Sequence, residues 1–120
     1  MNRGAQIALG ALIGGLGVAL GGFGAHALAE RLTDARLATF ETGARYQLIH
    51  ALAIVGAALV GGDRARVAVL LFAAGVVLFS GSLYALALTG VRAFGAVAPI
   101  GGACFIAGWV FLALAGLASR

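Results

Sequence analysis

The segment 40–50, FETGARYQLIH, places side chains capable of acid–base or ligand chemistry directly before an apolar run. Four of them stand out: Glu41, Arg45, Gln47 and His50. Polar and ionisable side chains are costly inside a membrane, and they are functional candidates there by default. A second histidine, His26, closes an earlier apolar run. Two histidines on neighbouring helices could ligate a metal ion or haem, or hydrogen-bond a quinone.

The chain carries no motif typical of an enzyme. A nucleophile elbow, a phosphate-binding loop and HExxH are all absent from the sequence, and its hydroxyl side chains have no base at motif spacing. Two histidines without further Cys, Asp or Glu at ligand spacing are a weak indication of a metal site. Cys104 is the only cysteine and lies in an apolar run, so we expect neither a disulfide nor a thiolate site. The sequence favours a protein that is not an enzyme.

The amino-acid composition indicates whether the segments that carry these residues lie in water or in a membrane. Of the 120 residues, 62% are hydrophobic and only 10% are charged, whereas charged residues make up about 25% of an ordinary soluble domain. A small soluble domain buries too little of its surface to hide so much apolar area. We therefore expect a single membrane domain.

Uncharged intervals divide the chain into four spans. Residues 4–29, 67–91 and 93–119 carry no formal charge, and each interval exceeds the roughly 20 residues that cross a bilayer. The interval 46–62 covers only about 26 Å as a helix, so the second span is marginal. The first apolar run is longer than a signal-peptide h-region of about 7–15 residues and is read as a membrane helix. We predict an all-α, four-helix transmembrane bundle with helices at about 5–28, 34–61, 67–89 and 97–118.

The second span is expected to gain length from an interfacial, amphipathic helical stretch that begins near Asp34. Thr33 or Asp34 can cap its N-terminus, and apolar residues at 37, 40 and 44 fall on one stripe. Glu41 and Arg45 are spaced i, i+4 and are expected to pair. Pro99 is expected in the first turn of the fourth helix, where proline is tolerated. Trp109 lies near the middle of that helix and is expected to be a packing residue.

Glycines recur along the first helix with the 4-3-4-3 spacing of a helix-packing seam, at Gly10, Gly14, Gly17, Gly21 and Gly24. Small residues let two helix backbones approach closely in lipid. This seam could pack either within the bundle or against another chain.

The net charge of +4 comes from eight arginines, since the chain contains no lysine. They are scattered over the loops and both ends, whereas nucleic-acid binding would need a clustered basic face. We expect the lipid bilayer as partner and no nucleic acid. Four arginines fall on the side of the termini (Arg3, Arg64, Arg66 and Arg120) and four on the other side (Arg31, Arg36, Arg45 and Arg92). Acidic residues accompany three of the second group, which favours cytoplasmic termini.

Antiparallel topology brings most polar side chains into one leaflet. His26 and His50 should lie at similar depth on adjacent helices and face each other. We expect a polar cluster of His26, Glu41, Arg45, Tyr46, Gln47, His50 and Tyr84. Its simplest role is structural, with hydrogen bonds that tie the helices together. The leading function is thus a non-enzymatic membrane protein, either an accessory subunit or a homo-oligomer. The alternatives are a module that binds haem, quinone or a metal ion at His26 and His50, and a small transporter.

Four stretches of the chain match a known family in the same order: GGFGAHAL, FETGARYQLIHALA, FSGSLYALALTG and APIGGACFIAGW. Together they resemble the YgdD-like family of small bacterial inner-membrane proteins, which has relatives in animal mitochondria. The resemblance covers nearly the whole chain. It implies a multi-pass protein of the bacterial inner membrane, and it implies no reaction, because the molecular function of the family is uncharacterised.

Overall fold

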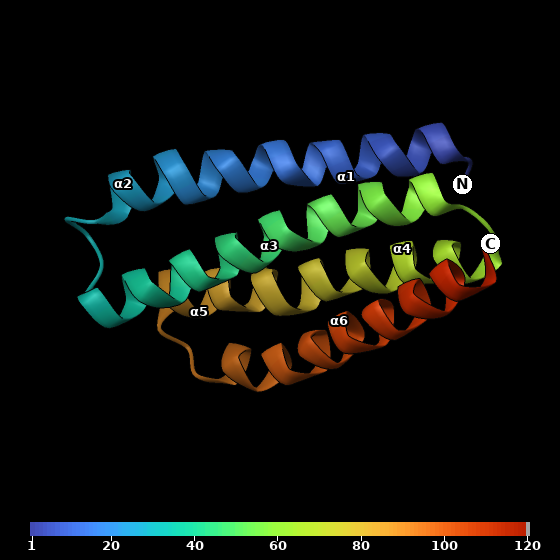
Figure 1. Cartoon of the computed structure of the whole chain (residues 1–120). Coiled ribbons are helices and arrows are strands. Elements are labelled where there is room, and N and C mark those ends of the chain that lie inside the picture. The colour runs from blue at the N-terminus through green and yellow to red at the C-terminus, as the bar shows by residue number, and fades with distance from the viewer. Residues whose placement is uncertain (120) are drawn as a thin grey trace.

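The computed structural model describes residues 1–119, so Arg120, counted above on the side of the termini, lies outside the described residues. These residues form four long antiparallel helices and contain no strand (Figure 1). The helices comprise 26, 27, 27 and 26 residues, and all four are long and apolar enough to cross a membrane. At about 1.5 Å per residue each spans about 40 Å, which exceeds a hydrocarbon core of about 30 Å. The predicted four-helix membrane fold is confirmed.

The first long helix consists of α1 (Arg3–Val18), the π-helical turn η1 (Ala19–Gly24) and α2 (Ala25–Leu28). Its N-terminus is capped by Asn2, whose side-chain oxygen accepts a hydrogen bond of 2.8 Å from the Ala5 backbone N–H. Such caps satisfy one of the amide groups that a helix start leaves without a partner.

The second long helix, α3 (Asp34–Val60), is continuous from its charged start to its apolar end. The Thr33 hydroxyl caps it by accepting from the Arg36 backbone N–H at 3.2 Å. The predicted amphipathic stretch therefore forms the first turns of α3, and these turns make the marginal span long enough. Two glycines with positive φ, Gly61 at 74° and Gly62 at 88°, form the tight turn that follows. Only glycine adopts this backbone conformation without strain.

The third long helix comprises α4 (Asp63–Gly75), the π-helical turn η2 (Val76–Ser80) and α5 (Gly81–Thr89), and the fourth is α6 (Ala93–Ala118). Both begin earlier than predicted, at Asp63 rather than residue 67 and at Ala93 rather than residue 97. The expectation that Pro99 lies in the first turn is therefore wrong, because Pro99 lies inside α6. Its ring has no N–H to donate, so the Gly95 carbonyl loses its helical partner.

The helices pack in a chain of neighbours: α1 against α3, α3 against α4 and α5, and those two against α6. The five glycines of the predicted seam all face α3, so the seam packs within the chain. A methyl group at Gly10 would lie 2.8 Å from a Val55 methyl group, and one at Gly21 would lie 3.1 Å from Ala44 Cβ. The main core lies between α3, α4, η2 and α6, and it consists of Ala53, Ile54, Ala57, Ala68, Val69, Phe72, Val76 and Phe105.

Candidate functional site

The seven residues of the predicted polar cluster do not form one cluster. His26, Glu41 and Arg45 are exposed on the bundle surface, Tyr46 is partly exposed, and Gln47 and His50 are buried. Tyr84 on α5 is half-buried. The structure joins Gln47 to Tyr84 by a hydrogen bond, and Tyr46 to His50 by ring stacking and a backbone contact. These two pairs define separate sites.

His50 packs against α6 and does not face α1. Its Nδ1 lies 2.7 Å from the Tyr46 carbonyl oxygen, and its Nε2 lies 3.1 Å from the Trp109 indole nitrogen. An indole N–H can only donate, so Nε2 accepts and Nδ1 carries the proton that is donated to the carbonyl. The Phe105 ring stacks on the imidazole with a centroid separation of 3.5 Å. Both nitrogens of a neutral His50 are therefore satisfied within the protein.

The expectation that His26 faces His50 does not hold. The glycine seam of the first helix faces α3, and successive residues of a helix are rotated by about 100°. His26, two residues after Gly24, is rotated about 200° from it and projects away from α3, where its side chain is exposed. Depth in the membrane alone could not reveal this difference in direction.

The expected pair of Glu41 and Arg45 is also absent. Within residues 1–119, the one ion pair joins Arg66 to Asp63 at 3.4 Å. An exposed ion pair adds little to stability, because water stabilises the two separate charges about as well as the pair does. Arg36, which the sequence did not single out as functional, instead donates from Nε to the Ala87 carbonyl oxygen at 2.7 Å. This contact places a cation at the negative C-terminal end of α5.

Gln47 connects three helices. Its Nε2 donates to the Ile13 carbonyl oxygen of α1 at 2.9 Å, and its Oε1 accepts from the Tyr84 hydroxyl of α5 at 2.6 Å. The Tyr84 ring fits against Gly43, where a Cβ would lie 2.9 Å from the ring. This network ties α1, α3 and α5 together through one side chain.

An aromatic groove of about 430 Å³ lies between α3 and α6. It is lined by Tyr46, Ile49, His50, Phe79, Gly102, Phe105, Ile106 and Trp109. These residues belong to the middle of their helices, so the groove opens on the side of the bundle, away from its two ends. Among the hydrogen bonds of residues 1–119, none involves the Tyr46 hydroxyl, whereas the hydroxyl of Tyr84 is paired. The aromatic groove therefore combines flat apolar walls with one available donor.

Sequence reasoning missed most of the aromatic residues around His50. Phe72, Phe105 and Trp109 surround the ring. The glycines of the third and fourth helices could have indicated these contacts, because phenyl rings occupy the space beside them. A Cβ at Gly108 would lie 2.7 Å from the Phe72 ring, and one at Gly75 would overlap Phe105. Trp109 was correctly read as a packing residue, although its hydrogen bond to His50 was not foreseen.

The donor set offers little to a metal ion. Across the part of the chain that the structure describes, no three His, Cys, Asp or Glu side chains approach closely enough to share one. Cys104, on α6, is a free thiol. The aromatic groove and the Gln47 network thus remain as the two features that could take part in ligand binding or in helix association.

Four apolar helices and polar residues bonded between them define an integral membrane protein of the multi-pass, all-α class. The family model described as "Protein of unknown function (DUF423)" matches residues 20–102. The chain belongs to this family.

Curated relatives span nearly its whole length. A UPF0382 membrane protein of Staphylococcus epidermidis is 44% identical over 92% of this chain and 93% of its own. The UPF0382 membrane protein YwdK of Bacillus subtilis is 41% identical, over 91% and 93%. The UPF0382 inner membrane protein YgdD of Escherichia coli is 42% identical, over 85% and 81%. No solved structure matches the chain. The predicted family and the location in a bacterial cell membrane are confirmed.

Proposed function

We propose that this protein is a non-enzymatic membrane protein that binds a lipid-soluble molecule in the aromatic groove. The ligand is a flat ring that bears a carbonyl group, which is the chemistry of a quinone head group. The observation that carries the proposal is the Tyr46 hydroxyl, which has no hydrogen-bond partner among residues 1–119 and belongs to a side chain that lines the groove.

The Tyr46 side chain is 39% exposed on the bundle surface and lines the aromatic groove, and its hydroxyl has no acceptor among residues 1–119. A carbonyl oxygen in the groove would accept from this hydroxyl, in a medium that offers little competing water. The rings of Phe79 and Phe105, whose centroids are 5.5 Å apart, would contact the faces or edges of a flat ligand. The groove admits such a molecule directly from the bilayer.

Haem and metal ions fit the site less well. A bis-histidine haem needs two facing imidazoles, and His26 is exposed on the far side of the first helix. Iron ligation by His50 would require the Nε2 lone pair that now accepts from Trp109. These contacts support an organic ligand over the haem and metal alternatives.

The other candidate roles have weaker support. The glycine seam packs on α3, so a homo-oligomer or a partner subunit would have to use the outer faces of the helices. A transporter needs an aqueous route, and the core between α3, α4 and α6 consists of packed apolar side chains. Co-purification from native membranes would identify a partner subunit.

The single tryptophan gives a direct test of ligand binding, because Trp109 lines the aromatic groove. We expect a short-chain benzoquinone to quench its fluorescence saturably in detergent solution. Tyr46→Phe should weaken binding roughly 5- to 10-fold, the equivalent of one hydrogen bond of about 1 kcal/mol.

A matched pair of glycine substitutions provides the control. A side chain at Gly102 enters the aromatic groove, and neither Gly102 nor Gly116 has an atom within 4 Å of an added Cβ. Gly102→Leu should abolish saturable quenching, whereas Gly116→Leu, on the same helix but outside the groove, should preserve it. Identical quenching in the wild type and Gly102→Leu would contradict the proposal.

A further inference from the structure

A small polar pocket lies at the end of the bundle that carries both chain termini. Its volume is about 150 Å³, and it is lined by Arg3, Gln6, Ala58, Gly61, Gly62 and Arg66. Water occupies roughly 30 Å³ per molecule in the liquid, so the pocket has room for a group the size of a few waters. Two guanidinium groups from different helices therefore share a space large enough for an oxyanion. We call it the arginine pocket.

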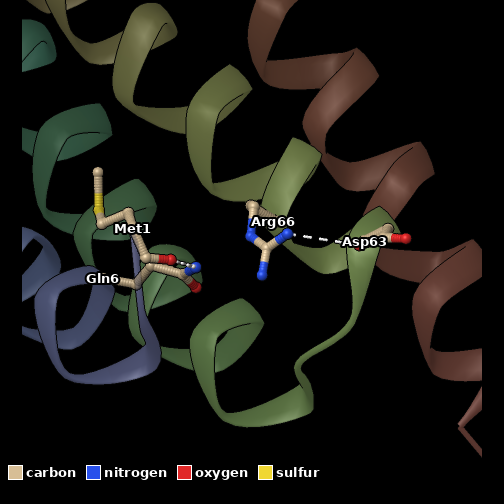
Figure 2. A network of polar contacts seen from close by, with 4 residues as sticks. All are labelled: Met1, Gln6, Asp63 and Arg66. Atoms are coloured by element: carbon tan, nitrogen blue, oxygen red, sulfur yellow. Dashed lines mark hydrogen bonds and ion pairs between the residues drawn. The ribbon is translucent and has the colours of Figure 1, made fainter.

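The arginine pocket has a surplus of positive charge. Figure 2 shows the Arg66 guanidinium between Asp63 on one side and Met1 and Gln6 on the other. Asp63 is the one acidic residue near it. The Arg66 Nη1–Asp63 Oδ1 distance is 3.4 Å, which is long for an ion pair, and the Asp63 side chain is 99% exposed. Such pairs contribute little. Arg3 makes no side-chain hydrogen bond within residues 1–119, and Gln6 is buried with its Nε2 bonded to the Met1 carbonyl oxygen.

An apolar groove lies farther along the first helix. Because α1 packs along α3 and not along α4, a space of about 470 Å³ remains between the first and third long helices. Leu9, Ile13, Leu16 and Leu20 line it on one side, and Ala73 and Val77 on the other. We call it the α1–α4 groove.

Helical register places the pocket and the groove along one stripe of the first helix. Gln6, Leu9, Ile13, Leu16 and Leu20 are spaced by three or four residues and so form one stripe along the first helix. Arg66 and Ala73 are two turns apart on one face of α4. From Gln6 to Leu20 the stripe extends about 21 Å, which is comparable to the length of a fatty acyl chain. A cationic pocket at the end of the bundle and an apolar groove nearer its middle thus follow one another along the same side of the first helix.

We propose that this surface binds one anionic phospholipid, with its phosphate group in the arginine pocket and an acyl chain in the α1–α4 groove. Two guanidiniums provide the fork-shaped donors that suit phosphate oxygens. Basic pockets between membrane helices on the cytoplasmic side recognise anionic head groups in general. This site is separate from the aromatic groove and does not depend on the function proposed above.

The test is native mass spectrometry of the full chain, purified in detergent and mixed with phosphatidylglycerol or phosphatidylcholine. We expect phosphatidylglycerol adducts to exceed phosphatidylcholine adducts several-fold. Arg3→Gln/Arg66→Gln should lower the phosphatidylglycerol adduct about tenfold. Arg31→Gln/Arg92→Gln removes the same charge at the opposite end and should leave the adduct unchanged.

Two further measurements keep the outcome decisive. Arg3→Lys/Arg66→Lys retains both charges but lacks the fork-shaped donors, so its adduct should lie between those of the wild type and the Gln double variant. An unchanged melting temperature of the Gln double variant without lipid separates loss of binding from loss of folding. Inorganic phosphate at millimolar concentration should raise the melting temperature less than phosphatidylglycerol does. Equal adducts in the two Gln double variants, or equal stabilisation by free phosphate and lipid, would overturn the assignment to a phospholipid.

Discussion

At the scale of single residues, two tyrosines show how the bundle treats polar groups. The Tyr84 hydroxyl donates to Gln47, which in turn bonds the backbone of α1, so one side chain connects α5, α3 and α1. Tyr46 lines the aromatic groove, and its hydroxyl has no such partner among residues 1–119. Hydrogen bonds between membrane helices contribute about 0.6 kcal/mol on average. Paired and unpaired hydroxyls should therefore respond differently to removal.

Tyr84→Phe should destabilise the bundle by about 0.6–1.7 kcal/mol, because it leaves the buried Gln47 Oε1 without its donor. Tyr46→Phe removes the same atom from a side chain with no protein partner and should change stability by less than about 0.5 kcal/mol. Equilibrium unfolding in mixed micelles of dodecyl sulfate measures both. A larger loss for Tyr46→Phe than for Tyr84→Phe would contradict this assignment of roles.

At the scale of elements, close approach of helices depends on which glycines face a neighbour. Gly10 and Gly17 contact α3, whereas Gly15 has no atom within 4 Å of an added Cβ. In the third and fourth helices, a Cβ at Gly101 would overlap the backbone of Phe79 in η2. The π-helical turn thus lies where α6 comes nearest. A π-helical turn shifts the register of the residues that follow it, so each such turn re-aims a helix face.

Alanine substitutions on the first helix should separate packing from propensity. Gly10→Ala places a methyl group 3.0 Å from the Ala51 carbonyl oxygen and should cost about 1–3 kcal/mol by overpacking. Gly15→Ala should be neutral, or stabilising by up to about 1 kcal/mol, because alanine is the better helix former. Thermal unfolding monitored by circular dichroism compares them. Equal effects at the two positions would show that the seam does not determine packing.

At the scale of the whole molecule, an even number of spans places both termini at one end, as Figure 1 shows. That end carries Arg3, Arg64 and Arg66 with Asp63 as its acid, and the other end mixes arginines with Glu30, Asp34 and Glu41. Arginine-rich loops are retained in the cytoplasm.

We expect both termini in the cytoplasm. In a Cys104→Ala background, Glu30→Cys should react with a membrane-impermeant maleimide in intact cells, and Ser119→Cys should react only after permeabilisation. Both positions are exposed, so accessibility reports the side of the membrane. The opposite labelling pattern would reverse the orientation without affecting the fold.

The sequence by itself determined the membrane class, the four spans, a helix cap at Thr33 or Asp34, and a glycine seam suited to close helix packing. Each of these follows from a property along the chain: the length of an uncharged interval, a local hydrogen bond, or a repeat at helical spacing. Helix starts were less well determined. The charged first turn of α4, residues 63–66, is helical although it lies outside the uncharged interval 67–91, and α6 begins at Ala93, four residues before its predicted start.

Only the tertiary structure decided which polar residues meet. His26 and His50 share a depth but point in different directions, and His50 instead bonds Trp109, which is distant along the chain. Likewise, the arginine pocket joins Arg3 to Arg66 from helices that do not pack on each other. The physical reason is that depth follows from position along a helix, whereas direction depends on the rotation of each helix about its axis. That rotation is set by the packing of rings against glycines on neighbouring helices.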